Sequence, residues 1–430
     1  MSKIKKHHAI LLGILLLGFL IRTGYILTLE NKVYWVDEFD YMALANHIVA
    51  GDGYVNDDGA ATAFRPVGYP LFLAMLRVVG INSLFAIRFV QVLLGVASIW
   101  LIYLLGKFLF RRSVGLAAAG ITSIYPYFIF VPGTVLATSW FSFLLIASTL
   151  LLFVGSETEN IKFILLSGLL FAWAALTRPS GIVLIVAVIL WLGVYTRPDF
   201  RRLLKLSIPF ALICGLAVAP WIYRNYQEFR IVNFSTNGGR NLWLGNNPRA
   251  TINTGSNIPL PKQLDAKIAA AKSEAEISRI YIREAKKFIL QNPKKSVLLF
   301  LEKAISFWRW DPSPTTQGYV RQNRLYRWIS ILSFGPVFSL SLLGFFFARA
   351  GTRKKLLLFF FYAVLFTFLH ALFITKVRFR LPLDYFTIVT ASFALMRFYE
   401  LAKNMQRKKL FANSGHAWDT RLVGNRMLDT

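Results

Sequence analysis

An acidic segment near the start of the chain has the residue types that a general base requires. Asp37 and Glu38 follow the first long apolar run, 9–29, and Asp40 stands three residues after Asp37. A carboxylate at such a boundary is partly shielded from water, so its pKa can be adjusted for proton abstraction. The same spacing also fits a helix N-cap at Asp37, with Asp40 completing a capping-box arrangement. The residues alone leave both interpretations open.

Four arginines are candidates for binding an anion beside these acids: Arg65, Arg178, Arg378 and Arg380. With a cytoplasmic N-terminus, all four fall on the outer side of a membrane, against the usual retention of basic residues inside. A guanidinium binds phosphate through two parallel bonds. Alternatively, each arginine could extend toward lipid headgroups. Several such sites beside an acidic loop favour one shared anionic ligand.

The shared role of Arg378 and Arg380 depends on the backbone between them. In an extended segment both side chains point to one face. In a helix they diverge, and one would then serve a lipid headgroup or an acid such as Asp384. We expect a short loop before Pro382, with both arginines on the phosphate of the ligand.

A polar loop at 235–248 contains amide side chains, glycines and one tryptophan. Asn237, Asn241 and Asn246 offer paired donors and acceptors, and Trp243 offers a stacking plane, which together suit a sugar. The alternative is a turn-rich connection, and the loop by itself favours that alternative.

Other chemistries lack their sequence signatures. Phosphate-binding GxxxxGK[ST], zinc-binding HExxH and nucleophilic GxSxG patterns are absent. Cys214 is the single cysteine, which excludes an internal disulfide and a cysteine metal cluster. His47 and His370 are isolated, and a packed histidine is the default for each. We assign no metal ligands and no cofactor, and a requirement for a divalent cation stays open.

The elements that must position these residues are membrane helices. Of the 430 residues, 56% are hydrophobic and 16% are charged, whereas soluble domains carry about 25% charged residues. The apolar runs are continuous rather than alternating, which excludes a β-barrel. We predict an all-α polytopic protein with about ten spans (range 9–13 allowed by the boundaries). The expected spans are 9–29, 84–106, 114–131, 134–155, 161–177, 181–196, 205–223, 327–348, 356–374 and 382–399.

Basic clusters give the orientation of these spans. The net charge is +28, and clusters of Lys and Arg flank the runs that end on the predicted inner side. This pattern is the positive-inside signature, so the charge indicates topology and contact with anionic membrane lipids rather than nucleic acid. Both termini are expected inside. The first run, 9–29, lacks a small-residue cleavage pattern and is expected to remain as a span.

Two long outer segments divide the chain. We expect a membrane module at 1–223, whose first outer loop, 30–83, carries the acids. A large outer loop follows at 224–326, then C-terminal spans at 327–400 and an inner tail at 401–430. Within the loops, we expect a short re-entrant or interfacial stretch at 69–79, a water-exposed helix at 263–291 and an interfacial helix at 296–310.

The order of several short motifs resembles a known superfamily. The motifs are Asp37-Glu38, the Arg-Pro-x-Gly-Tyr-Pro segment at 65–70, Pro-Trp-x-x-Arg-Asn-Tyr at 220–226, Ser-Thr-Asn-Gly-Gly at 235–239, Gly-Asn-Asn-Pro at 245–248 and the basic segment 378–382. The chain resembles the GT-C glycosyltransferases that use polyprenyl-phosphate sugars. It is most similar to the bacterial branch of glycosyltransferase family 39, which includes relatives of protein O-mannosyltransferases and of lipid A aminoarabinose transferase. Val67 departs from that branch, which usually has a second proline there, so the substrate does not carry over.

This resemblance implies a sugar donor of the undecaprenyl-phosphate type and an acceptor lipid, glycan or protein. Asp37 matches the family's base and Arg65 matches a residue that contacts the donor phosphate. The expected reaction is inverting transfer at the outer, periplasmic face of a bacterial cytoplasmic membrane. Glu38 is the second expected catalytic residue and would orient the site, and Arg178, Arg378 and Arg380 would hold the phosphate. The remaining substrate-binding assignments are Tyr41, Asp57, Asp58, Tyr69, Asn237, Asn241, Trp243 and Asn246.

A transporter or flippase for lipid-linked sugars is the alternative from another class. It would share the spans and could bind a lipid phosphate with the same arginines. Transporters, however, place polar sites near the membrane midplane and often contain internal repeats. No repeat is evident here and the acids cluster at one face, which favours an enzyme. A non-catalytic assembly scaffold would have no need of Asp37.

Overall fold

The computed structural model describes residues 3–252, 254, 258–310 and 324–413. Across these residues the regular structure is helical, apart from one isolated bridge between Val55 and Ala61. The apolar helices of the bundle are α1 (Lys3–Leu27), α4 (Leu84–Leu109), α5 (Arg112–Ile124), α7 (Thr138–Thr158), α8 (Ile161–Thr177), α9 (Gly181–Tyr195), α10 (Phe200–Phe229), α15 (Arg324–Phe347), α16 (Ala350–Leu372) and α17 (Val377–Asn413). The remaining elements are α2 (Val36–Ala50), α3 (Gly68–Val78), α6 (Pro126–Phe130), η1 (Val131–Gly133), α11 (Gly238–Gly245), α12 (Lys262–Ala269), α13 (Glu274–Gln291) and α14 (Pro293–Phe307).

These ten helices form a bundle that suits a membrane. Six of the described helices are long and apolar enough to cross a bilayer, or seven if a bent pair counts as one span, and α8 and α9 are shorter apolar helices. Each predicted span overlaps one of these ten helices. The all-α, polytopic fold class predicted from the sequence is therefore confirmed.

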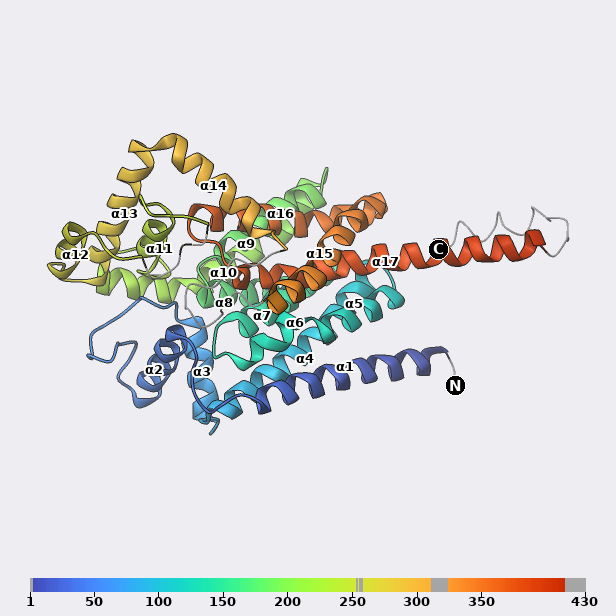
Figure 1. Cartoon of the computed structure of the whole chain (residues 1–430), viewed down its shortest axis with the longest axis horizontal. Helices are drawn as coiled ribbons and strands as arrows, with labels where there is room; N and C mark the ends of the chain where they lie inside the picture. The colour runs from blue at the N-terminus through green and yellow to red at the C-terminus, as the bar shows by residue number, and fades with distance from the viewer. Residues whose placement is uncertain (1–2, 253, 255–257, 311–323, 414–430) are drawn as a thin grey trace.

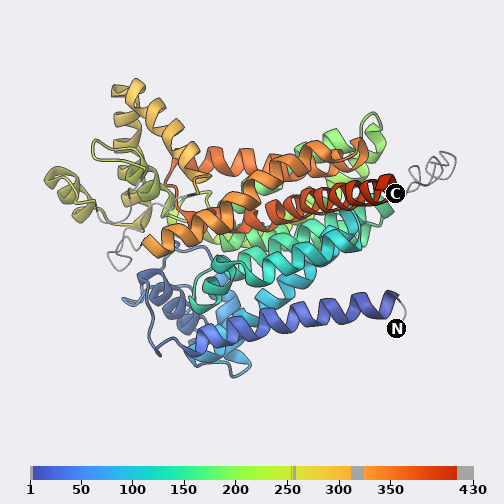
Figure 2. The same cartoon turned by 45° about the vertical axis from the view of Figure 1, so that its right-hand side comes forward.

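The two ends of the bundle differ in what they carry. The N-terminus of α1 and the far end of α17 lie at one end, and α2, α3 and α11 to α14 gather at the opposite end (Figures 1 and 2). We call this second end the loop end. Helix α2, which carries the acids, thus lies on the same side of the bundle as α11 to α14 (Figures 1 and 2).

The predicted span 114–131 is wrong as a continuous helix. The chain bends by 60° between α5 and the α6–η1 segment, because Pro126 cannot supply the backbone N–H that a continuous helix needs. Arg22 of α1 compensates for part of this break. Its guanidinium donates to the carbonyl oxygens of Ser123 at 2.8 Å and Thr122 at 3.0 Å, which have lost their helical partners.

The loop end differs from the sequence predictions in one helix. The stretch expected at 69–79 is α3, and the one expected at 296–310 is α14. The expected helix at 263–291, however, is two helices, α12 and α13. Ser273 divides them: its backbone is extended and its side chain accepts from the N–H of Glu276, so it begins a new helix as an N-cap.

Candidate active site

Asp37 is not a helix cap. The N-cap of α2 is Trp35, with no side-chain capping bond, and Asp37 lies within the first turn. Its carboxylate instead contacts two arginines from distant parts of the chain. Of the two interpretations left open by the sequence, the contacts favour an acid with a role beyond helix capping.

Arg65 connects Asp37 to Asp40. Its Nη2 donates to Asp37 Oδ1 at 2.8 Å and to Asp40 Oδ2 at 2.6 Å, and its Nε donates to Asp40 Oδ2 at 2.9 Å. Asp40 reaches the same guanidinium because residues three apart share one face of a helix. Sequence reasoning gave Asp40 no role in the site, although this spacing from Asp37 was the signal that could have found it.

Arg378 contacts the other oxygen of Asp37. Its Nη1 donates to Asp37 Oδ2 at 3.0 Å, and 38% of its side chain is exposed. Burial acts to raise the pKa of Asp37, but Arg378 and Arg65 outweigh it and hold the pKa below its ordinary value. Asp37 is therefore ionised at neutral pH, with one arginine on each oxygen.

Glu38 has a different environment from its neighbour. Its side chain is buried, and neither carboxylate oxygen accepts a well-aligned hydrogen bond. Burial raises its pKa to about 7, although backbone N–H groups of Val135 and Tyr34 and the charge of Arg88 act in the opposite direction. Adjacent acids with different pKa values can perform different tasks.

Arg178 approaches the same group from the loop between α8 and α9. Its Nη2 donates to the hydroxyl of Thr138, and its guanidinium lies over the Phe141 ring, 5.3 Å from the centroid. Among the described residues, no carboxylate forms an ion pair with Arg178. Burial lowers the pKa of Arg178 to about 10, and the charges of Arg378 and Asp37 act on it. Arg178 still carries its charge at neutral pH.

Gly68 allows the loop that carries Arg178 to lie close to the segment that carries Arg65. A Cβ at Gly68 would lie 2.6 Å from the backbone nitrogen of Thr177, and the Gly68 carbonyl accepts from the indole of Trp173 at 3.1 Å. The start of α3 therefore packs directly on the end of α8, one residue before Arg178. This contact explains the glycine of the 65–70 motif: it brings the segment that carries Arg65 against the loop that carries Arg178.

The expectation for Arg380 is wrong. Because α17 begins at Val377, Arg378 and Arg380 lie on one helix and diverge. Arg380 is buried; its Nε donates to Asp384 at 3.0 Å, and its Nη1 donates to the carbonyl oxygens of Phe307 and Arg309. Arg380 therefore joins α17 to the end of α14 and does not face Asp37.

The amide-rich loop is mainly structural. Trp243 is buried against Tyr281, which corrects the expectation of an exposed stacking plane. Asn246 donates to the carbonyl oxygens of Leu242 and Leu372, which corrects its assignment to sugar binding. Asn241 is half-buried, and the buried Oδ1 of Asn237 has no partner; their assignment to substrate stays a prediction.

The other residues that were predicted to bind substrate differ in how far they are buried. Tyr41 lies beside Arg65, whose guanidinium is 5.4 Å from the ring centroid. Tyr69 is fully buried and donates to Gln91, so its hydroxyl has a structural partner. Asp57 is 86% exposed and faces His47, and Asp58 is exposed on the same turn. These two aspartates have no contact with the Asp37 group among the described residues.

The two histidines differ in their environments. His370 is packed between the rings of Phe307 and Phe379, as expected. His47 bonds Asp52 at 2.9 Å, and this bond raises its pKa, which corrects the expectation of a packed side chain. In the described part of the chain no group of three or more His, Cys, Asp or Glu side chains could hold a metal ion, and a cation requirement stays open.

Comparison with known proteins supports the family resemblance. The family model for dolichyl-phosphate-mannose-protein mannosyltransferase matches residues 65–223. This range contains Arg65, Gly68, Thr138 and Arg178. A search of the curated proteins finds no match.

Solved structures of one protein support the fold. The archaeal oligosaccharyltransferase AglB from Archaeoglobus fulgidus, in complex with an inhibitory peptide and a dolichol-phosphate, has a TM-score of 0.57 at 15% identity, covering 97% of this chain and 53% of that one. The same protein in the apo form has a TM-score of 0.56 at 15% identity, covering 98% and 53%. ArnT from Cupriavidus metallidurans, bound to undecaprenyl phosphate, has a TM-score of 0.45 at 12% identity, covering 92% and 78%.

This chain spans about half the length of AglB, and at this identity the likeness concerns the fold. Together with the family match, it confirms the resemblance to GT-C proteins that the motif order indicated.

Proposed function

We propose that this protein is a membrane glycosyltransferase that moves a sugar from a polyprenyl-phosphate donor to a hydroxyl of an acceptor lipid, glycan or protein. One observation carries the proposal: Asp37 lies between Arg65 and Arg378, with Arg178 close by. A carboxylate suits proton abstraction, and the surrounding guanidinium groups suit a phosphate leaving group.

The reaction would proceed by inversion. Asp37 takes the acceptor's hydroxyl proton while that oxygen attacks the anomeric carbon. The bond from the anomeric carbon to the phosphate oxygen breaks, and polyprenyl phosphate leaves with the electron pair. Arg178 and Arg378 stabilise the charge that develops on the phosphate.

Donor binding would also activate the base. In the structure both oxygens of Asp37 accept from arginine, which holds its pKa down. A phosphate that recruits Arg378 would remove one of these bonds and let the pKa of Asp37 rise. Asp37 would then become a stronger base when the donor is present.

The proposed setting is the bacterial cytoplasmic membrane, with the loop end facing outward. The support is the basic clusters, which by sequence flank the inner ends of the spans. Asp57→Cys should then react with a membrane-impermeant thiol reagent from outside, because that side chain is 86% exposed. Lys403→Cys, exposed at the far end of α17, should react only after the membrane is opened. The reverse pattern would overturn the orientation.

The function is tested with purified protein and a panel of radiolabelled polyprenyl-phosphate sugars and candidate acceptors. The expected result is labelled sugar on one acceptor class, with release of polyprenyl phosphate. If the protein instead moves intact labelled donor across a vesicle membrane and releases no sugar, it is a flippase and the proposal fails.

A further inference from the structure

The position of Arg65 depends on a segment that runs from Tyr54 to Phe64. This segment turns back on itself: Thr62 N donates to Tyr54 O at 3.2 Å, and Asn56 N donates to Ala60 O at 2.9 Å. The hydroxyl of Tyr54 donates to Arg65 O at 2.9 Å. We call residues 54–64 the strap. Any movement of the strap would move the backbone that presents the Arg65 guanidinium to Asp37.

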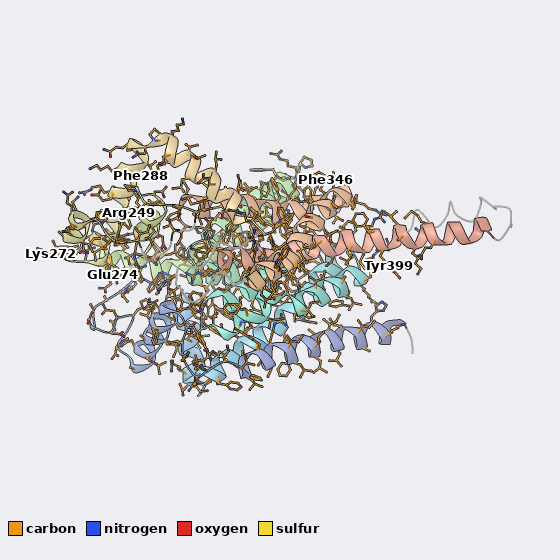
Figure 3. The ribbon with its side chains drawn as sticks, in the orientation of Figure 1. Arg249, Lys272, Glu274, Phe288, Phe346 and Tyr399 are labelled. Carbon is orange, nitrogen blue, oxygen red and sulfur yellow. The ribbon has the colours of Figure 1, made fainter. Side chains whose placement is uncertain are left out.

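The second loop region binds the strap through Glu274, at the start of α13. Glu274 Oε1 accepts from the hydroxyl of Thr62 at 2.5 Å, and its Oε2 accepts from Ala63 N and the hydroxyl of Thr236, both at 2.9 Å. Thr236 N in turn donates to Ala63 O at 2.9 Å. One carboxylate therefore joins two loops that are more than 150 residues apart, and in Figure 3 Glu274 lies where these two parts of the loop end meet.

Arg224 holds the strap from a third element, α10. Its Nη1 donates to Thr62 O at 2.7 Å and its Nη2 to Tyr54 O at 2.9 Å. Trp221, one helical turn earlier, donates to Phe234 O at 2.8 Å. The 220–226 motif therefore fixes both the strap and the approach to Thr236, a purpose that sugar transfer itself does not explain.

Gly239 brings α11 against α13 so that these bonds can form. A Cβ at Gly239 would lie 2.3 Å from the Ser278 carbonyl oxygen, closer than packed atoms approach. The 235–239 motif thus supplies a donor to Glu274 at Thr236 and a close helix contact at Gly239. These two residues act on α13 rather than on a ligand.

From these contacts we infer that Glu274 and Arg224 are positioning residues that couple the 224–326 region to the site by fixing the strap, and through it Arg65. The inference about the strap rests on these contacts alone; its effect on turnover rests on the proposed function. Glu274 acts through hydrogen bonds to the strap, so charge by itself is not sufficient: three donors require two acceptor oxygens.

Hydrogen–deuterium exchange of the full-length protein in lipid nanodiscs tests the strap without any substrate. Glu274→Gln keeps the size of the side chain but replaces one acceptor oxygen with a donor. We expect peptides covering 54–65 to exchange about tenfold faster, because hydrogen bonds to a charged acceptor are lost. Thr236→Val, a milder change that removes one donor, should give a smaller increase. Glu276→Gln is the matched control: it is exposed on the same turn and accepts from Lys272 N.

Turnover then tests the link to Arg65. Glu274→Gln should lower kcat about tenfold in the parent and add little in an Arg65→Lys background, because residues acting through one group are not additive. Unchanged exchange in Glu274→Gln, or equal exchange in Glu276→Gln, would overturn the inference, as would full additivity with Arg65→Lys. If exchange increases as expected but the parent transfers no sugar, the inference about the strap is supported and the proposed function fails.

Discussion

Two arginine–aspartate pairs begin two residues apart on α17 and differ in almost every respect. Arg378 and Asp37 come from opposite ends of the chain, and their side chains are 38% and 25% exposed. Arg380 and Asp384 are one helical turn apart, and their side chains are 1% and 0% exposed. Asp37 shares its two oxygens between two arginines, whereas Asp384 also accepts from the hydroxyl of Tyr125.

This difference separates a site from a structural pair. A buried ion pair within one helix, whose guanidinium also donates to two backbone carbonyl oxygens, is not accessible to a ligand from solvent. A half-exposed pair between distant segments can exchange one partner for a phosphate oxygen. The two pairs therefore make different predictions for the same substitutions, and each pair serves as the control for the other.

The largest effect is expected at the two aspartates. Asp37→Asn should lower turnover about a hundredfold or more, because the general base is lost, while the melting temperature changes little. Asp384→Asn should instead lower the melting temperature, because it leaves the buried Arg380 charge without its partner, a loss of about 3–5 kcal/mol. Turnover and thermal unfolding of both purified variants provide the test. Near-normal turnover in Asp37→Asn would show that Asp37 is not the general base, and the two pairs would then not differ in function.

A smaller effect is expected at Arg178. Arg178→Ala should weaken donor use about thirtyfold, since one charge-assisted bond to the phosphate contributes roughly 1.5–3 kcal/mol. The measurement is kcat/KM for the donor, with Arg249→Ala as control, because Arg249 is exposed on the loop after α11 and is not one of the arginines that contact the Asp37 group. Equal losses in the two variants would mean that Arg178 has no special relation to the phosphate.

Arginine-to-lysine changes sharpen the contrast on α17. Arg378→Lys should reduce kcat/KM about tenfold with an unchanged melting temperature, because lysine keeps the charge but loses the planar fork. Arg380→Lys should lower the melting temperature and change kcat/KM only in proportion to lost folded protein. If Arg380→Lys instead lowered kcat/KM for the donor without lowering the melting temperature, Arg380 would be a phosphate ligand after all.

The smallest effect on turnover is expected from Glu38. Its folded pKa of about 7 lies above the usual 4.5, so the folded state binds the proton more tightly than the unfolded state. Stability should therefore fall as pH rises from 4.5 to 7, by about 3 kcal/mol at 1.36 kcal/mol per pKa unit. Glu38→Gln should remove this slope and change turnover less than about threefold. Melting temperatures from pH 4.5 to 8 would show the difference, and parallel curves for parent and variant would refute it.

The sequence was sufficient for the parts of the site that membrane topology determines. Asp37, Arg65, Arg178 and Arg378 all follow from charged residues expected on one side of the membrane, and the structure brings them together. The different roles of Arg378 and Arg380 could not be predicted from the sequence. Pro382 suggested an extended segment before it, but α17 begins at Val377 and includes the proline.

The amide-rich motifs could not be interpreted from sequence for a related reason. Asn246 bonds the carbonyl of Leu372, and Thr236 bonds Glu274; both depend on which distant backbone lies nearby. Amide and hydroxyl groups serve a ligand or a loop equally well, so residue type alone does not distinguish them. The bend after α5 is different, because Pro126 was visible in the sequence and its effect on the span could have been foreseen.

The most direct test of the central claim measures binding and turnover together in Asp37→Asn. Equilibrium binding of polyprenyl phosphate is compared with transfer from the matching donor sugar, in the parent and in the variant. Because Asp37 competes with the phosphate for Arg378, the account predicts that the variant binds polyprenyl phosphate at least as tightly as the parent while turnover falls about a hundredfold. If binding and turnover fall together, or neither changes, Asp37 is a structural acid and this cluster is not the site of transfer.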